Sequence, residues 1–195
     1  MSRMRQSRDT PFIKILTGIR RCGKSSLMEM FMDELRESGV SDDRIFYSNL
    51  DDVDGGIETF SELMDSVSSK IPDVRGAYLF FDEIQNVSEW EHAVSTFYIH
   101  GADVYMTGSN SDMLSTELST KLSGRCLEIR IQPLMFSEYL HFRNSDDPDR
   151  LLEDYIRYGG FPCGIAHDGC DARSGKGHLG RDLQHRLHQG CRGQA

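Results

Sequence analysis

Apolar positions along the chain form two kinds of pattern, short runs of strand length and longer stripes at helical spacing, and the two kinds alternate. Residues 77–81 are a continuous apolar run, which is typical of a strand covered on both faces in a parallel sheet. Residues 126–131 alternate between apolar and polar, which predicts a strand with one wetter face. The predicted strands cover residues 12–17, 44–50, 77–81, 103–107 and 126–131.

Helical stripes lie between these strands and after the last of them. Gly39 is the expected C-terminal cap of the first helix. Ser88 is the expected N-cap of a later helix that carries Trp90, and we assign Trp90 to the core. The predicted helices cover residues 26–38, 59–71, 90–97, 112–122, 135–142 and 148–158.

This alternation predicts an α/β fold in which a parallel sheet carries helices on both faces and the crossovers are right-handed. Ligands of such sheets bind at the carboxyl ends of the strands. Three segments whose residues could bind or react with a ligand follow predicted strands at that edge. They are the loop 18–25, Asp82-Glu83 and Gly108-Ser109-Asn110. We therefore expect these segments to converge on one site.

Residues 18–25, Gly-Ile-Arg-Arg-Cys-Gly-Lys-Ser, fit the G-x-x-x-x-G-K-[ST] pattern of a phosphate-binding loop. Gly18 and Gly23 lack a Cβ atom, so the backbone can curl and point its N–H groups at phosphate oxygens. The start of the next helix adds its positive dipole end. We expect Lys24 to bind the β- and γ-phosphates of ATP and to assist catalysis, and the Ser25 hydroxyl to ligate Mg²⁺. The expected nucleotide-binding residues are Gly18, Ile19, Arg20, Arg21, Cys22, Gly23, Lys24, Ser25 and Ser26.

A second chemical pattern is the run of four apolar residues that ends in Asp82-Glu83. We expect Asp82 to hold Mg²⁺ through the water shell of the ion, and Glu83 to polarise the water that attacks the γ-phosphate. The alternative is a solvated strand end. The position of the pair, on a strand downstream of a phosphate-binding loop, favours the catalytic interpretation.

Two further residues are candidates for catalysis. Ser109 follows the next strand and is our first choice for orienting the water or contacting the γ-phosphate; the alternative is a turn-forming role. Arg125 precedes the last strand and is a candidate arginine finger for the nucleotide of a neighbouring subunit; the alternative is an ordinary surface arginine.

Composition narrows the possible partners. The 195 residues carry a formal net charge of −9, which argues against nonspecific binding to nucleic acid. The sequence predicts neither a membrane span nor a signal peptide. Five cysteines without a C-x-x-C pair favour a reducing cytoplasm. Cys22, inside the loop, is interpreted as a small packing residue, with redox sensing as the alternative.

The two ends of the chain lack periodicity, and we expect both to be disordered. Residues 1–10 are polar and basic and are interpreted as a lead-in. Residues 163–195 hold seven of the 18 glycines and four of the seven histidines, and we interpret them as an unstructured, out-of-frame or artificial tail. A zinc site is disfavoured because the spacing matches no zinc template. Its candidate ligands would be Cys163, His167, Cys170 and His178.

Five segments together resemble the AAA-type ATPases, and more narrowly a prokaryotic family of predicted ATP-binding proteins. They are Thr17–Ser25, Phe81–Gln85, Thr107–Asn110, Leu122–Arg125 and Tyr158–Pro162.

The resemblance covers residues 11–162 and implies a P-loop three-layer sandwich with strand order 5-1-4-3-2. It also implies hydrolysis of Mg-ATP by the residues named above. It divides the chain into an ATPase core over residues 11–143 and the start of a helical lid over 144–162. Family members usually carry a C-terminal domain thought to be nuclease-like; we expect that domain, and any lid arginine, to be missing here.

We therefore predict a module that binds ATP and hydrolyses it with Mg²⁺. The alternatives are a nucleotide-gated interaction switch without useful turnover and an inactive truncated fragment. A GTPase is disfavoured because no [NT]-K-x-D motif occurs, and a small-molecule kinase because no second substrate site is evident. A homo-oligomer stays open, and the sequence does not indicate which protein or nucleic acid is the partner.

Overall fold

The fold is built on one parallel sheet. A computed structural model of the chain describes residues 1–51, 56–108, 122, 124–143 and 148–161. The strand order is β2-β3-β4-β1-β5, with every pair parallel, which confirms the predicted order 5-1-4-3-2. The strands are β1 (Ile13–Thr17), β2 (Ile45–Asn49), β3 (Tyr78–Asp82), β4 (Asp103–Thr107) and β5 (Cys126–Arg130).

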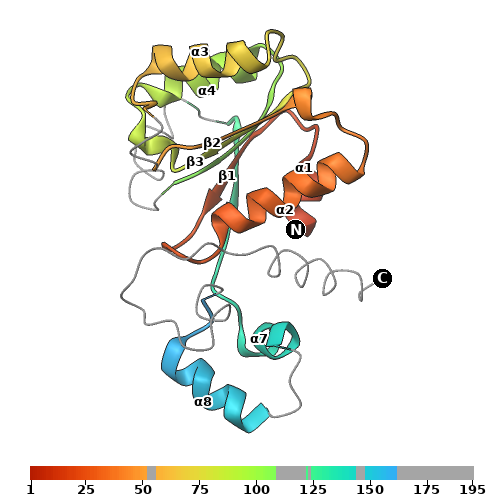
Figure 1. The fold of residues 1–195 in the computed structure, drawn as a ribbon, viewed down its shortest axis with the longest axis vertical. Helices are drawn as coiled ribbons and strands as arrows, with labels where there is room; N and C mark the ends of the chain where they lie inside the picture. Colours follow the sequence, from red (N-terminus) through yellow and green to blue (C-terminus); the bar gives the residue numbers. More distant parts are fainter. Residues whose placement is uncertain (52–55, 109–121, 123, 144–147, 162–195) are drawn as a thin grey trace.

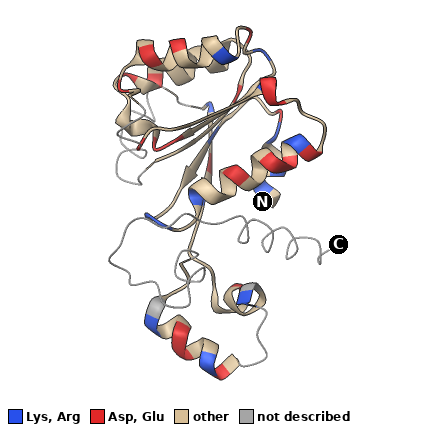
Figure 2. Cartoon of the chain, in the orientation of Figure 1, with Lys and Arg blue, Asp and Glu red and all other residues tan. Residues whose placement is uncertain are grey.

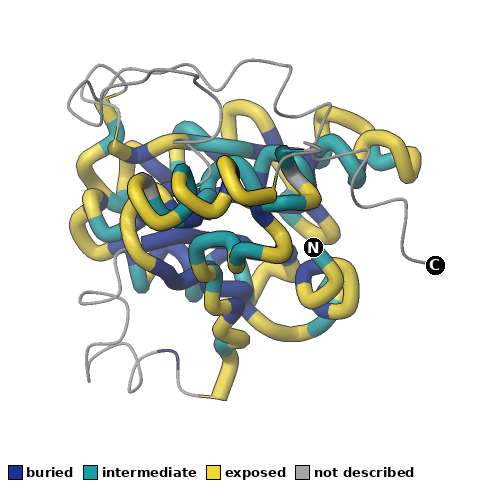
Figure 3. The backbone as a smooth tube through the Cα atoms, turned by 90° about the horizontal axis from the view of Figure 1, so that it is seen from below, coloured by how far each residue is buried: buried dark blue, intermediate teal, exposed yellow. Residues whose placement is uncertain are grey.

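Burial separates the middle of the sheet from its β5 edge. Every residue of β1, β3 and β4 is buried, because helices cover both faces of these strands. In β5 only Ile129 is fully buried, as expected for the wetter strand. Figure 3 shows buried segments in dark blue at the centre, with half-buried and exposed segments in teal and yellow around them.

Helices form a layer on each side of the sheet (Figure 1). The helices α3 and α4 pack on one face, over a core that includes Phe46, Phe81 and Phe97. The helices α1 and α2 pack on the other face, where Phe31 meets Phe80 and Tyr105. The helices are α1 (Ser2–Ser7), α2 (Lys24–Glu37), α3 (Phe60–Lys70), α4 (Trp90–Ile99), α7 (Phe136–Arg143) and α8 (Pro148–Tyr158), with short 3₁₀ turns η1 (Asp42–Arg44) and η2 (Ile84–Asn86).

Local chemistry explains most helix ends. At the end of α2, Gly39 adopts a left-handed φ of 94°, and its N–H and that of Val40 bond back to the last turn, as a glycine C-cap requires. Thr59 and Glu62 form a capping box at the start of α3. The prediction that Ser88 caps α4 is wrong. The Ser88 hydroxyl and N–H both donate to the Glu58 carbonyl, and the helix begins after Glu89.

The prediction of a disordered lead-in over residues 1–10 is also wrong. Residues 2–7 form α1, and Met4 is fully buried in the core beneath α2. Arg8 donates to the Tyr78 hydroxyl at 3.0 Å and to the Ser38 hydroxyl at 3.1 Å. A helix of six residues is too short to show a period in the sequence, and tertiary contacts of this kind stabilise it.

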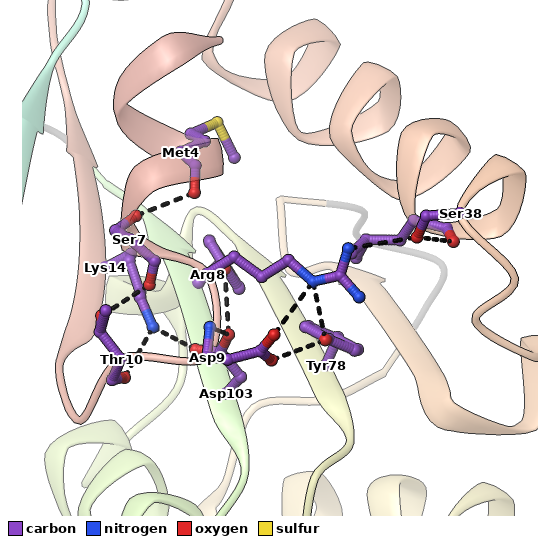
Figure 4. Close-up of polar contacts among 11 residues, drawn as sticks. Met4, Ser7, Arg8, Asp9, Thr10, Lys14, Ser38, Tyr78 and Asp103 are labelled. Carbon is purple, nitrogen blue, oxygen red and sulfur yellow. Dashed lines mark hydrogen bonds and ion pairs between the residues drawn. The ribbon is translucent and has the colours of Figure 1, made fainter.

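A buried ion pair between β1 and β4 lies next to this segment (Figure 4). Lys14 bonds to Asp103 and donates to the Thr10 carbonyl at 3.1 Å. The second oxygen of Asp103 accepts from the Tyr105 hydroxyl and the Asp9 N–H, at 3.1 and 3.0 Å. Burial lowers the pKa of Lys14 and raises that of Asp103, because it disfavours the charged form of each. These contacts join the N-terminal segment to the amino ends of β1 and β4.

The helices α7 and α8 pack against each other through a small cluster that includes Tyr139, Leu151 and Tyr155. The chain before α7 is tied to the chain after α8, because the Leu134 N–H donates to the Gly160 carbonyl at 2.8 Å. These two helices were predicted from the sequence. The predicted helix over 112–122 lies outside the described residues except for Leu122, and the tail 163–195 lies wholly outside them. Among the described helices, none has the length and apolar character that a membrane crossing needs.

We predict that Lys14→Met lowers the free energy of unfolding by about 3–5 kcal/mol, because it leaves the Asp103 carboxylate buried without its cation. Urea denaturation at pH 7 measures the loss. Lys14→Met/Asp103→Asn removes both charges and should recover most of it. Lys14 opposes the effect of burial on the pKa of Asp103, so the folded-state pKa of this carboxyl should be higher in the single variant than in the parent, and the deficit should shrink as pH falls toward 5. A deficit that stays constant with pH would contradict this account.

Candidate functional site

The loop that follows β1 leaves no room for a side chain at its first residue. A Cβ atom on Gly18 would lie 2.4 Å from the Ile131 carbonyl oxygen and 2.7 Å from the Cys22 sulfur. Gly23, immediately before α2, has φ 98° and supplies no capping side chain. The first N–H groups of α2 therefore have no side-chain cap, and this arrangement suits an anion.

The other side chains of the loop divide between surface and core. Ile19, Arg20 and Arg21 are exposed, whereas Cys22 is buried. Figure 2 shows the basic residues of this loop as a blue segment between β1 and α2. Burial raises the pKa of Cys22, which disfavours the reactive thiolate and agrees with a packing role. Ser25 and Ser26 are half-buried in the first turn of α2.

Lys24 connects the loop to the acidic pair on β3. Its side chain is buried, and its Nζ donates to the Gly18 carbonyl at 3.2 Å. The same Nζ lies 3.9 Å from Oε1 of Glu83. The structure thus brings the two sequence patterns together at the carboxyl edge of the sheet, as their positions after parallel strands predicted.

Thr107 holds the two acidic residues in place. Its hydroxyl donates to the Asp82 carboxylate and accepts the Glu83 backbone N–H at 2.9 Å. Glu83 has φ 54° and ψ 50°, a left-handed conformation that is uncommon for residues other than glycine. Ser109, our first choice among the polar residues that close this strand, lies outside the described residues. Thr107 begins the segment Thr107–Asn110 that carries the resemblance, and it is the polar residue that closes this buried strand next to β3.

Two residues near Asp82 were not predicted from the sequence. Burial, and then the negative charge of Asp82, raise the pKa of both Glu29 and Tyr47. Glu29 follows Ser25 by four residues on α2, so the two share a helix face. Tyr47 precedes by two residues the β2 position that pairs with Asp82. These spacings could have indicated both residues.

Comparison with known proteins identifies the group to which this fold and site belong. A family model described as an AAA domain matches residues 10–140. The chain belongs to the AAA domain family. Membership supports nucleotide binding and an ATPase-type function in general terms.

Two curated relatives of this AAA domain are both described as uncharacterized proteins. The Haemophilus influenzae protein is 37% identical over 170 residues, which cover 84% of this chain and 42% of that protein. The Methanocaldococcus jannaschii protein is 34% identical over 164 residues, which cover 77% of this chain and 35% of that protein. The chain thus spans less than half the length of either relative.

A solved structure has the same fold as this AAA domain. It is a DNA polymerase III gamma subunit-related protein of Thermotoga maritima, with a TM-score of 0.55 and 10% sequence identity. The match covers 84% of this chain and 55% of that chain. At this identity the likeness shows the fold alone.

Arg125 lies at the opposite edge of the AAA domain from the loop. It directly precedes β5, whose first residue pairs with Ile13 at the start of β1, whereas the loop follows the end of β1. Its guanidinium lies over the Tyr98 ring, 5.8 Å from the centroid. The structure therefore does not bring Arg125 to the Lys24–Glu83 site of its own chain. An arginine-finger contact with a neighbouring subunit stays a prediction.

The oxygen groups of this AAA domain fit a magnesium ion shared with a nucleotide. Within the described ranges, no cluster of three or more His, Cys, Asp or Glu residues could hold a metal alone. Mg²⁺ does not require one, because it commonly takes one or two protein oxygens and completes its shell with phosphates and water. Asp82 offers a buried carboxylate and Ser25 offers a hydroxyl.

We predict that Thr107→Val lowers the free energy of unfolding by about 1–3 kcal/mol, because the buried Asp82 carboxylate and the Glu83 N–H each lose a partner. Denaturant titration measures the change. Thr96→Val is the matched control. Among the described residues, the Thr96 hydroxyl bonds only to the His92 carbonyl, one turn earlier in α4, so this variant should change stability by no more than about 0.5 kcal/mol. Equal losses in the two variants would contradict the bridging role of Thr107.

Proposed function

We propose that this chain binds ATP through the loop 18–26 and hydrolyses it to ADP and phosphate with Mg²⁺. The observation that carries the proposal is the 3.9 Å approach of Lys24 Nζ to Glu83 Oε1 at the carboxyl edge of the sheet. A lysine suited to phosphate and a carboxylate suited to a water proton lie next to each other there, on elements that Thr107 and the glycine turns fix in place.

Each residue has a role in this reaction. The backbone N–H groups of the loop and the start of α2 bind phosphate oxygens, and Lys24 adds a positive charge. Ser25 and Asp82 would hold Mg²⁺, which supplies further positive charge against the phosphates when bound. Glu83 accepts a proton from water as the water oxygen attacks the γ-phosphorus. The bond between that phosphorus and the leaving oxygen of ADP breaks in the same reaction.

Glu83→Gln is expected to reduce Mg-dependent phosphate release about a hundredfold or more and to leave ATP binding intact, because the amide keeps the shape of the side chain but cannot take the proton. Phosphate release and equilibrium ATP binding are measured on the same preparations. Glu89→Gln makes the same chemical change at an exposed site and is the control. Equal, background-level release by both variants and the parent would instead indicate a nucleotide-binding switch or an inactive chain.

Lys24→Ala is expected to weaken ATP binding by roughly 1.5–3 kcal/mol, about 10- to 150-fold in Kd, because a charge-assisted contact with phosphate is lost. Calorimetric titration with a nonhydrolysable ATP analogue measures Kd without turnover. Lys70→Ala removes an exposed lysine at the end of α3 and should leave Kd unchanged. An unaltered Kd in Lys24→Ala would contradict the role given to this lysine.

A further inference from the structure

In the described part of the chain, the side chains of three residues form a hydrogen bond or an ion pair with Glu83. They are Lys24, Thr107 and Gln85. Gln85 lies in the middle of η2, two residues after Glu83. Its Nε2 donates to Oε2 of the Glu83 carboxylate at 2.7 Å. The chemistry fixes the amide orientation, because a carboxylate accepts hydrogen bonds and repels a carbonyl oxygen.

The other end of the Gln85 amide has no hydrogen-bond partner in the part of the chain that the structure describes. Its Oε1 is buried and accepts no hydrogen bond from the described residues. An unsatisfied buried acceptor destabilises a fold, because it has lost its hydrogen bonds to water. Stability alone therefore does not account for this side chain, since an apolar residue of the same length would avoid the unpaired oxygen. The bond to Glu83 is what the amide contributes.

The two oxygens of Glu83 have different partners. Gln85 binds Oε2, whereas Lys24 lies 3.9 Å from Oε1. Phosphate oxygens compete with the carboxylate for Lys24, because both are anionic acceptors of the same ammonium group. They do not compete for Gln85, whose amide is neutral. Once Lys24 turns to a nucleotide, Oε1 becomes free to take a proton while Oε2 stays bound.

We propose that Gln85 is a positioning residue that holds Oε2 of Glu83, so that Oε1 accepts the proton of the attacking water. The inference rests on the proposed hydrolysis. In the hydrolysis step, the water oxygen forms the new bond to the γ-phosphorus, ADP leaves with the electron pair of the broken bond, and the water proton goes to Oε1 of Glu83. Gln85 gains and loses no proton; it restricts the rotation of the Glu83 side chain.

Gln85→Met tests this role, because methionine has nearly the same length but no hydrogen-bond donor. We expect kcat for ATP hydrolysis to fall about 10- to 100-fold, as for a misplaced catalytic group, while KM and the Kd of a nonhydrolysable ATP analogue change less than about twofold. The thermal midpoint should stay the same or rise, because the unpaired oxygen is gone. Asn86→Ala is the matched control in the same turn. The Asn86 amide donates to the Leu50 carbonyl at 3.1 Å, so kcat should be unaffected.

The outcomes separate this inference from the function on which it rests. Absence of Mg-dependent hydrolysis in the parent protein would overturn the proposed function and the positioning role together. Hydrolysis by the parent with an unchanged kcat in Gln85→Met would overturn the positioning role alone. The positioning role would also be overturned if Gln85→Met lost thermal stability, or if its ATP affinity fell by the same factor as its kcat. If Gln85→Met does not fold, Gln85→Leu is the second variant, and failure of both to fold would make Gln85 structural and overturn the proposal.

Discussion

The approach of Lys24 to Glu83 is the constraint on which the candidate site depends. Two side chains of opposite charge, from elements separated by much of the domain's sequence, lie 3.9 Å apart with the lysine buried. A buried ammonium group is costly unless acceptors surround it. The Gly18 carbonyl and the Glu83 carboxylate are those acceptors, and an incoming phosphate would be another. In the proposed function, a nucleotide phosphate would replace one or both of these acceptors.

The central strands carry polar groups at both ends and apolar groups between them. Lys14 and Asp103 meet at the amino ends of β1 and β4, while Thr107 and Asp82 meet at the carboxyl ends of β4 and β3. The first pair anchors the N-terminal segment and closes one edge of the sheet. The second pair lies at the opposite edge, next to Glu83 and the candidate site. A buried strand can carry such groups only where each one finds a partner, and this requirement fixes the register of the sheet.

The sequence predicted the sheet and the tight turn of the loop 18–25 because both depend on local patterns. A continuous apolar run indicates a strand that is buried on both faces. The spacing of Gly18, Gly23 and Lys24 indicates a tight backbone turn before a helix. The contacts of Thr107 and Gln85 depend instead on pairing between strands and on a left-handed turn at Glu83, which no local period encodes. The same reason explains the error at the N-terminus, where one buried methionine and a set of long-range hydrogen bonds stabilise a helix of six residues.

The missing side chain of Gly18 has a mechanical consequence. The start of the loop lies directly against the Ile131 carbonyl, and the Ile131 N–H donates to the Thr17 carbonyl at 2.7 Å. Packed protein interiors transmit small displacements because they contain few voids to absorb them. Ile131 begins the connection that leads from β5 to α7 and α8. A displacement of the loop at Gly18 would therefore also displace Ile131, at the start of the connection that leads to this helical pair.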